Sequence, residues 1–96
     1  MVATMEAPVY RAQRFSLQYP VHYRKIGAPH WQDGETINIS RTGILFQACE
    51  SLPTDSILDI EVHLPKKVTL FCQGSIVRAE ESKLAVQIHR YDLYRG

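Results

Sequence analysis

The chain has 96 residues, of which 45% are hydrophobic and 22% charged, and its formal net charge is +1. This composition is that of one ordinary globular domain and excludes an intrinsically disordered chain. So small a net charge gives no general attraction to DNA, RNA or acidic lipid, and any anion site has to be built from a few local arginines. No apolar run is long enough to span a membrane, and the first fifteen residues lack the charged-then-apolar order of a signal peptide.

The first segments predict an arm followed by a strand. Residues 1–12 are expected to form a flexible N-terminal arm. The stretch SLQYPVHYR, residues 16–24, places Leu17, Tyr19, Val21 and Tyr23 on one face and polar side chains on the other. This alternation is typical of a half-buried antiparallel strand.

Five further strands are expected along the rest of the chain. In chain order they are ETINIS (35–40), GILFQAC (43–49), ILDIEVHL (57–64), VTLFCQGSIVRA (68–79) and KLAVQIHR (83–90). The stretches 57–64 and 83–90 repeat the alternation of apolar and polar residues seen in the first strand. Gly74 in the longest stretch predicts a bulge or bend, and residues 91–96 form a short tail, at most a helical stub. Short turns and the lack of a long helical pattern indicate an all-β fold, a small six-stranded antiparallel β-barrel over residues 13–90. The side chains expected to point inward are Leu17, Tyr19, Val21, Ile60, Val62, Leu64, Val86 and Ile88.

Catalytic and metal-binding patterns are not found in the sequence. No serine stands in a recognisable nucleophile context, no glycine-rich phosphate loop occurs, and the four histidines show neither HxH nor HExxH spacing. His22, His63 and His89 fall on the polar phase of predicted strands, so they are expected to be solvated surface residues. The chain is predicted not to be an enzyme and to hold no metal and no cofactor.

The remaining acidic and sulfur-containing residues are given ordinary roles. Asp59 and Glu61 face the same way on one predicted strand and are interpreted as surface residues that provide solubility. Cys49 and Cys72 are the only cysteines and lie far apart without CxxC spacing. Free buried thiols in a reducing cytosol are therefore favoured over a disulfide.

The stretch NISRTG, residues 38–43, lies between two predicted strands. A hairpin turn explains most of it, with Gly43 at a positive φ and the Asn38 or Ser40 side chain bonded back to the main chain. Such a turn does not need Arg41 as well. A second basic stretch, YRAQRF at residues 10–15, comes just before the first strand.

Together these two stretches resemble the PilZ family of cyclic-di-GMP receptors. That family carries RxxxR ahead of its first barrel strand and [D/N]xSxxG between the second and third strands, and Asn38, Ser40 and Gly43 match the second motif. The resemblance covers nearly the whole chain from about Tyr10. It implies a split-barrel fold of the PilZ type and a cytoplasmic regulatory module of bacterial second-messenger signalling. Such a module would bind cyclic di-GMP, act through a protein partner, bind neither DNA nor RNA, and not insert into a membrane.

The resemblance also implies a ligand site. Arg14 would fork two hydrogen bonds onto a guanine or pair with a phosphate. The side chains of Asn38 and Ser40 would bond a base edge or a phosphate. Gly43 would let the backbone approach the ligand closely, because a side chain there would occupy the ligand's space.

The arginine motif departs from RxxxR. With Arg14 as the second arginine, Tyr10 stands at the first position; with Arg11 as the first, Phe15 stands at the second. We prefer the first register, since in the family an arginine followed by an aromatic residue precedes the strand. Arg11 and Arg41 are then expected helpers, and Tyr10 can stack on a base but cannot make the bidentate pair. The alternative is a degenerate PilZ domain that binds no nucleotide and acts as a protein–protein interaction module.

Overall fold

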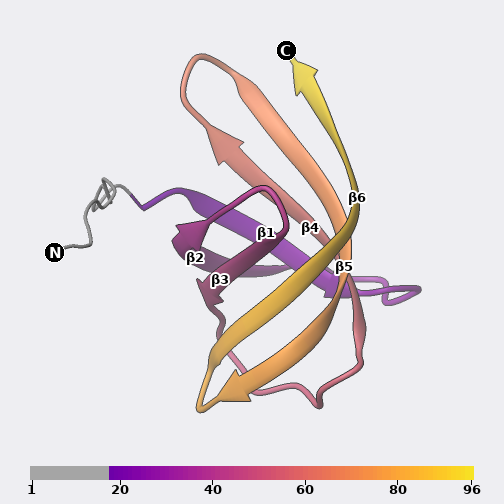
Figure 1. Cartoon of the computed structure of the whole chain (residues 1–96). Helices are drawn as coiled ribbons and strands as arrows, with labels where there is room; N and C mark the ends of the chain where they lie inside the picture. The colour runs from indigo at the N-terminus through magenta and orange to yellow at the C-terminus, as the bar shows by residue number, and fades with distance from the viewer. Residues whose placement is uncertain (1–17) are drawn as a thin grey trace, which may run out of the picture.

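Six antiparallel strands close into a barrel in the computed structural model, which describes residues 18–96 (Figure 1). Neighbouring strands around the barrel follow the order β1-β2-β3-β6-β5-β4, with β4 returning to β1. The described residues form no helix, and the prediction of a six-stranded antiparallel barrel is confirmed. The strands are β1 (Pro20–Lys25), β2 (Gln32–Ile39), β3 (Gly43–Gln47), β4 (Ile57–Leu64), β5 (Val68–Glu80) and β6 (Lys83–Arg95).

The barrel interior is filled by every second side chain of each strand, as the period-two pattern predicts. Val21, Ile60, Val62 and Val86 of the predicted inward set are buried. The other described members, Tyr19, Leu64 and Ile88, are half-buried and pack against this core, and Leu17 lies outside the described residues. The fully buried side chains also include Tyr23, Phe46, Leu58, Cys72, Ile76 and Leu84.

Tyr23 connects the core to the loop that follows β3. Its ring lies 5.1 Å from that of Phe46 between centroids, and its hydroxyl accepts a 3.2 Å hydrogen bond from the Cys49 main-chain N–H. The pKa of Tyr23 is raised well above its usual range. Burial is the larger cause, and the side-chain hydrogen bond with Cys49 is the second. Both cysteines are free, as predicted. Cys72 is buried and its pKa is raised to about 11 by desolvation, but Cys49 is exposed, so the prediction of a buried thiol is wrong there.

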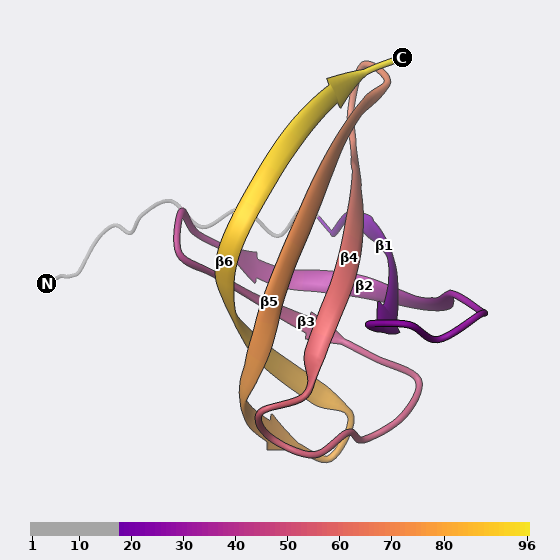
Figure 2. The ribbon, with the colours of Figure 1, turned by 90° about the vertical axis from the view of Figure 1, so that its right-hand side faces the viewer.

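The β5–β6 hairpin is much longer than the other pairs, and Figure 2 shows it rising with β4 beyond β1, β2 and β3. The prediction of a helical stub at residues 91–96 is wrong, because β6 continues to Arg95, which pairs with Val68 of β5. Gly96 then donates its N–H to the Lys67 carbonyl at 2.9 Å. The predicted irregularity at Gly74 is confirmed by a register shift between Gln73 and Gly74.

Asp59 of β4 is covered by its cross-strand neighbours. Its carboxylate accepts a hydrogen bond from Arg24 Nε at 3.3 Å and another from Gln73 Nε2 at 3.0 Å. The Arg24 guanidinium lies 4.4 Å from the centroid of the Trp31 ring, which helps to close the cluster. Asp59 is only 6% exposed, so its interpretation as a solvated surface residue is wrong.

Candidate ligand-binding site

The turn between β2 and β3 is held by the Ser40 side chain. The Ser40 hydroxyl accepts hydrogen bonds from the main-chain N–H groups of Gly43 (3.2 Å) and Thr42 (3.4 Å). The Ser40 N–H donates to the Gly43 carbonyl at 2.9 Å, which closes the turn. The prediction that a side chain of this motif bonds back to the main chain is therefore confirmed for Ser40, and the turn is fixed by local contacts alone.

Gly43 lies close to β6 and does not have a left-handed backbone. The predicted positive φ is wrong, since Gly27, at 84°, is the one glycine of residues 18–96 with such a φ. Gly43 is the first residue of β3 and pairs with Gln87 of β6. A Cβ built on it would lie 3.1 Å from the Val86 carbonyl oxygen, which is tighter than an ordinary contact.

Asn38 reaches its position through a bulge. The register between β2 and β3 shifts between Thr36 and Asn38, leaving Ile37 as the extra residue, 40% exposed. Thr36 on one side of the bulge is buried, whereas Asn38 is exposed and faces Leu45 of β3. Bulges of this kind re-aim side chains next to functional sites. Here the bulge places the Asn38 amide beside the turn.

These three motif residues line one surface hollow of about 440 Å³, called here the turn hollow. It lies over parts of β2, β3, β5 and β6. No acidic side chain belongs to its lining, so nothing within it repels a phosphate. The lining consists of Asn38, Ser40, Thr42, Gly43, Ile44, Leu45, Val77, Ala85, Val86 and Gln87.

The other predicted site residues are not all brought to the turn hollow. Arg41 is exposed and lines a second hollow of about 440 Å³, which shares Ser40 with the first. This second hollow lies against the β5–β6 hairpin, where Tyr91 is 58% exposed. Tyr10, Arg11 and Arg14 lie outside the described residues, so their places in the site stay predictions.

The structure adds two apolar residues to the site that motif reasoning missed. Val77 of β5 is 55% exposed, and Ala85 of β6 lies near it in the same lining. Flat apolar surface beside polar groups suits the face of a planar base. A signal for this surface exists in the sequence, because Val77 falls on the outward phase of β5, where a polar residue is expected.

The barrel carries a preformed polar turn at the edge of the turn hollow. The model for the PilZ domain family matches residues 10–94. The chain therefore belongs to the PilZ family, whose members are non-catalytic cyclic-di-GMP receptor modules. The resemblance and the prediction of a non-enzyme are both confirmed by this membership.

Neither the comparison with curated proteins nor that with solved structures found a match. No helix of residues 18–96 is long and apolar enough to cross a membrane.

Proposed function

We propose that this PilZ domain binds cyclic di-GMP at the turn hollow and acts in the cytoplasm as a regulatory module on a protein partner. The observation that carries the proposal is the convergence of Asn38, Ser40 and Gly43 on one open hollow. Arg14 supplies the principal charged contact in this proposal, and Tyr10, Arg11 and Arg41 supply secondary ones.

The hollow suits the ligand in size and chemistry. Its volume of about 440 Å³ lies within the range of small-molecule sites, about 300–1,000 Å³. Cyclic di-GMP presents two guanines and two phosphates, which need donors for O6, N7 and phosphate oxygens and apolar surface for the base planes. The Asn38 amide supplies polar groups for an edge, and Val77 and Ala85 supply the apolar surface. The Ser40 hydroxyl already accepts two main-chain bonds and donates its own proton to the Gly43 carbonyl at 3.3 Å, so little hydrogen-bonding capacity is left for a ligand. Its main contribution is to hold the turn.

The start of the described chain supports a role for the arginine arm. The Tyr19 N–H donates to Thr36 Oγ1 and the Thr36 N–H donates to the Tyr19 carbonyl, both at 3.0 Å. The chain therefore meets the barrel beside β2, two residues before Asn38. Arg14 precedes Tyr19 by five residues, a distance that an extended chain spans over at most about 18 Å. Chain length alone thus permits Arg14 to reach the turn hollow.

Tyr10 is the weak point of the proposed site. A phenol offers one donor, whereas a guanidinium offers five in a fork that fits guanine. Absence of one good bidentate contact weakens binding by about 1–3 kcal/mol, or roughly five- to 150-fold. We therefore expect an affinity below that of a domain with both arginines.

Calorimetric titration of the full chain with cyclic di-GMP tests the proposal. Arg14→Ala is expected to lower affinity by about 1–3 kcal/mol, the range for a guanine-pairing arginine. Arg95→Ala, which removes an exposed arginine at the far end of β6, is the matched control and should bind like the wild type. Equal affinity of Arg14→Ala and Arg95→Ala would move the site away from the arm.

A second candidate function, protein binding without nucleotide, is favoured by one observation. The end of β6 exposes Tyr91, Leu93 and Tyr94 by 58%, 61% and 57% of their surface. Exposed aromatic and aliphatic side chains in one strand are typical of contact surfaces. This candidate replaces the first if neither the wild type nor Tyr10→Arg binds cyclic di-GMP.

A further inference from the structure

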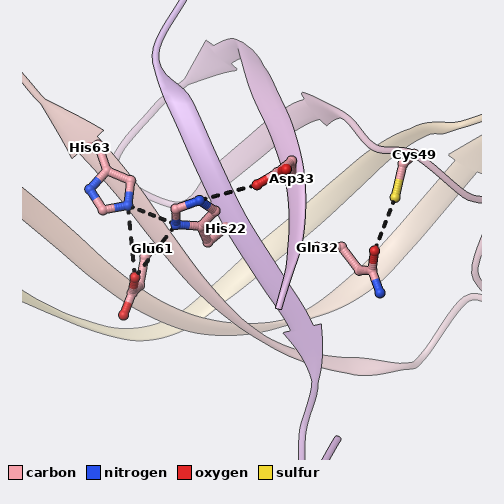
Figure 3. A network of polar contacts seen from close by, with 6 residues as sticks. All are labelled: His22, Gln32, Asp33, Cys49, Glu61 and His63. Carbon is pink, nitrogen blue, oxygen red and sulfur yellow. Dashed lines mark hydrogen bonds and ion pairs between the residues drawn. The ribbon is translucent and has the colours of Figure 1, made fainter. Parts of the chain in front are cut away.

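The outer face of β1 and β4 brings together two histidines and a glutamate that are far apart in the sequence. In the register of these strands, His22 stands directly opposite Glu61, and His63 follows Glu61 on the same face of β4. Directly opposite side chains of an antiparallel pair have Cβ atoms about 4.5–5.5 Å apart, and long diagonal neighbours also meet. The two rings therefore approach each other beside one carboxylate, as Figure 3 shows.

The ligand atoms of this cluster point at a common space. His63 Nε2 lies 3.0 Å from His22 Nδ1, and Glu61 Oε1 lies 3.9 Å from His22 Nδ1 and 3.8 Å from His63 Nε2. Tetrahedral Zn²⁺ with bonds of about 2.0–2.1 Å requires ligand atoms roughly 3.3 Å apart. All three separations are within about 0.6 Å of this value. Rotation of half-exposed side chains, without movement of the strands, is enough to reach it.

His22 is also oriented by a carboxylate on its other side. Asp33 of β2 stands opposite His22, and its Oδ1 lies 3.2 Å from His22 Nε2. In the tautomer that carries its proton on Nε2, His22 donates that proton to Asp33 and its Nδ1 accepts the 3.0 Å hydrogen bond from His63 Nε2–H, which a metal ion would replace. Metal-binding histidines almost always donate their second N–H to such a carboxylate, carbonyl or water, which fixes the tautomer. The barrel thus supplies the ligand set and the outer partner of one ligand.

Neighbouring charges do not oppose a cation here. The next outward residue of β1 is Arg24, whose guanidinium is engaged by Asp59 and stacked on Trp31. Glu61 and Asp33 place two carboxylates beside the two rings. Two imidazoles and one carboxylate form a ligand set known from zinc sites with a fourth position left for water.

We propose that His22, Glu61 and His63 form a Zn²⁺ site on the outside of the β1–β4 seam, with water as the fourth ligand and Asp33 as a positioning residue. The site does not depend on the proposed nucleotide function. The β1–β4 seam lies opposite the β3–β6 seam in the strand order, and the turn hollow adjoins the latter. Zinc bound here would join β1 to β4 through residues 22, 61 and 63, and would therefore stabilise the strand pair that closes the barrel.

Titration of the metal-free 96-residue chain with ZnCl₂, followed by calorimetry and by thermal unfolding, tests this site. A ligand that binds only the folded state at tenfold its Kd is expected to raise the Tm of a domain of this size by about 6–11 °C. The measurements are made in a Cys49→Ser background, because the exposed thiol is a possible zinc ligand itself. Residues 1–17 contain neither histidine nor cysteine.

Variants locate the site. His22→Gln and His63→Gln are each expected to abolish the Zn²⁺-dependent rise in Tm, and His89→Gln, which alters an exposed histidine of β6, is the matched control and should keep it. Asp33→Asn is expected to weaken Zn²⁺ about tenfold while leaving the Tm of the apo-protein unchanged. A merely structural Asp33 would not alter Zn²⁺ affinity.

Three results would overturn the proposal. The first is no binding of Zn²⁺ and no rise in Tm at millimolar metal. The second is an unchanged Zn²⁺ response in both His22→Gln and His63→Gln. The third is loss of the response in His89→Gln alone. Since two separate ligands are tested, failure of one variant to fold leaves the other to decide.

Discussion

Replacing Gly43 by alanine separates the packing of the turn from its proposed contact with the ligand. The new Cβ would lie 3.1 Å from the Val86 carbonyl oxygen, so β6 has to give way by a few tenths of an ångström. Because φ of Gly43 is not positive, alanine also restricts the unfolded chain, which stabilises the fold by about 0.4–1 kcal/mol. The two effects are opposite in sign and similar in size. We expect the free energy of unfolding to change by less than about 1 kcal/mol.

Gly74→Ala is the comparison that shows what a true packing glycine does. A Cβ on Gly74 would collide with the Gln87 carbonyl and lie 2.8 Å from Val86 Cγ1. Neither neighbour is the free end of a flexible chain, so the strands have to separate. Overpacking of this kind destabilises by about 1–3 kcal/mol, and a domain of this size then loses roughly 5–20 °C in Tm.

The affinity of Gly43→Ala carries the functional test. Gly43 belongs to the lining of the turn hollow, where we place the ligand. If the ligand contacts the Gly43 backbone there, the added methyl group would weaken binding by about 1–3 kcal/mol, or roughly five- to 150-fold. Thermal unfolding and calorimetric titration with cyclic di-GMP are measured on the same samples, in the wild type or in Tyr10→Arg if that chain binds more tightly. Unchanged affinity at unchanged Tm would refute the contact between the Gly43 backbone and the ligand. A loss of Tm as large as that of Gly74→Ala would instead assign Gly43 to packing.

Three further predictions use the arm and the core. Tyr10→Arg restores RxxxR and is expected to raise cyclic-di-GMP affinity about tenfold by calorimetry; a rise with Phe15→Arg and none with Tyr10→Arg would favour the other register. Because burial raises the pKa of Cys72 from 9.0 to about 11, its contribution to stability is complete below pH 9 and falls as the pH rises to 11. The urea concentration at the unfolding midpoint should fall over the same pH range, and this pH dependence should be weaker in Cys72→Ala. A thiol reagent should modify Cys49 alone in the native chain. Asp59→Ala removes the charged acceptor of two half-buried donors, Arg24 and Gln73, and is expected to lower stability by about 1.5–3 kcal/mol in urea unfolding. A loss below about 0.5 kcal/mol would contradict this.

The strands were predictable because alternation is a local property. The stretch 57–64 coincides with β4, and the stretch 68–79 with β5 apart from its last residue. The end of β6 was not predictable in the same way. YDLYR, residues 91–95, does not alternate, and its extended conformation comes from pairing with β5 across the long hairpin. Tertiary pairing overrides weak local preference at such ends.

Asp59 shows what alternation cannot reveal. Its outward phase is correct, since it lies on the opposite face of β4 from Leu58 and Ile60. Its burial depends on Arg24 and Gln73, which are 35 and 14 residues away and become neighbours only through the register. The cluster of His22 and His63 was hidden for the same reason, because 41 residues separate them.

The motif at residues 38–43 predicted which residues gather at one place, but the structure changes what each is expected to do. Ser40 closes the turn with its own hydroxyl, so the turn is formed without ligand. Ligand binding then has no turn to order, and preorganisation of this kind leaves affinity to the contacts that are added. In the proposed site those contacts come chiefly from residues 10–14. Substitutions in residues 10–14 should therefore change cyclic-di-GMP affinity more than substitutions at Asn38 do. A larger effect at Asn38 would place the main ligand contacts on the barrel.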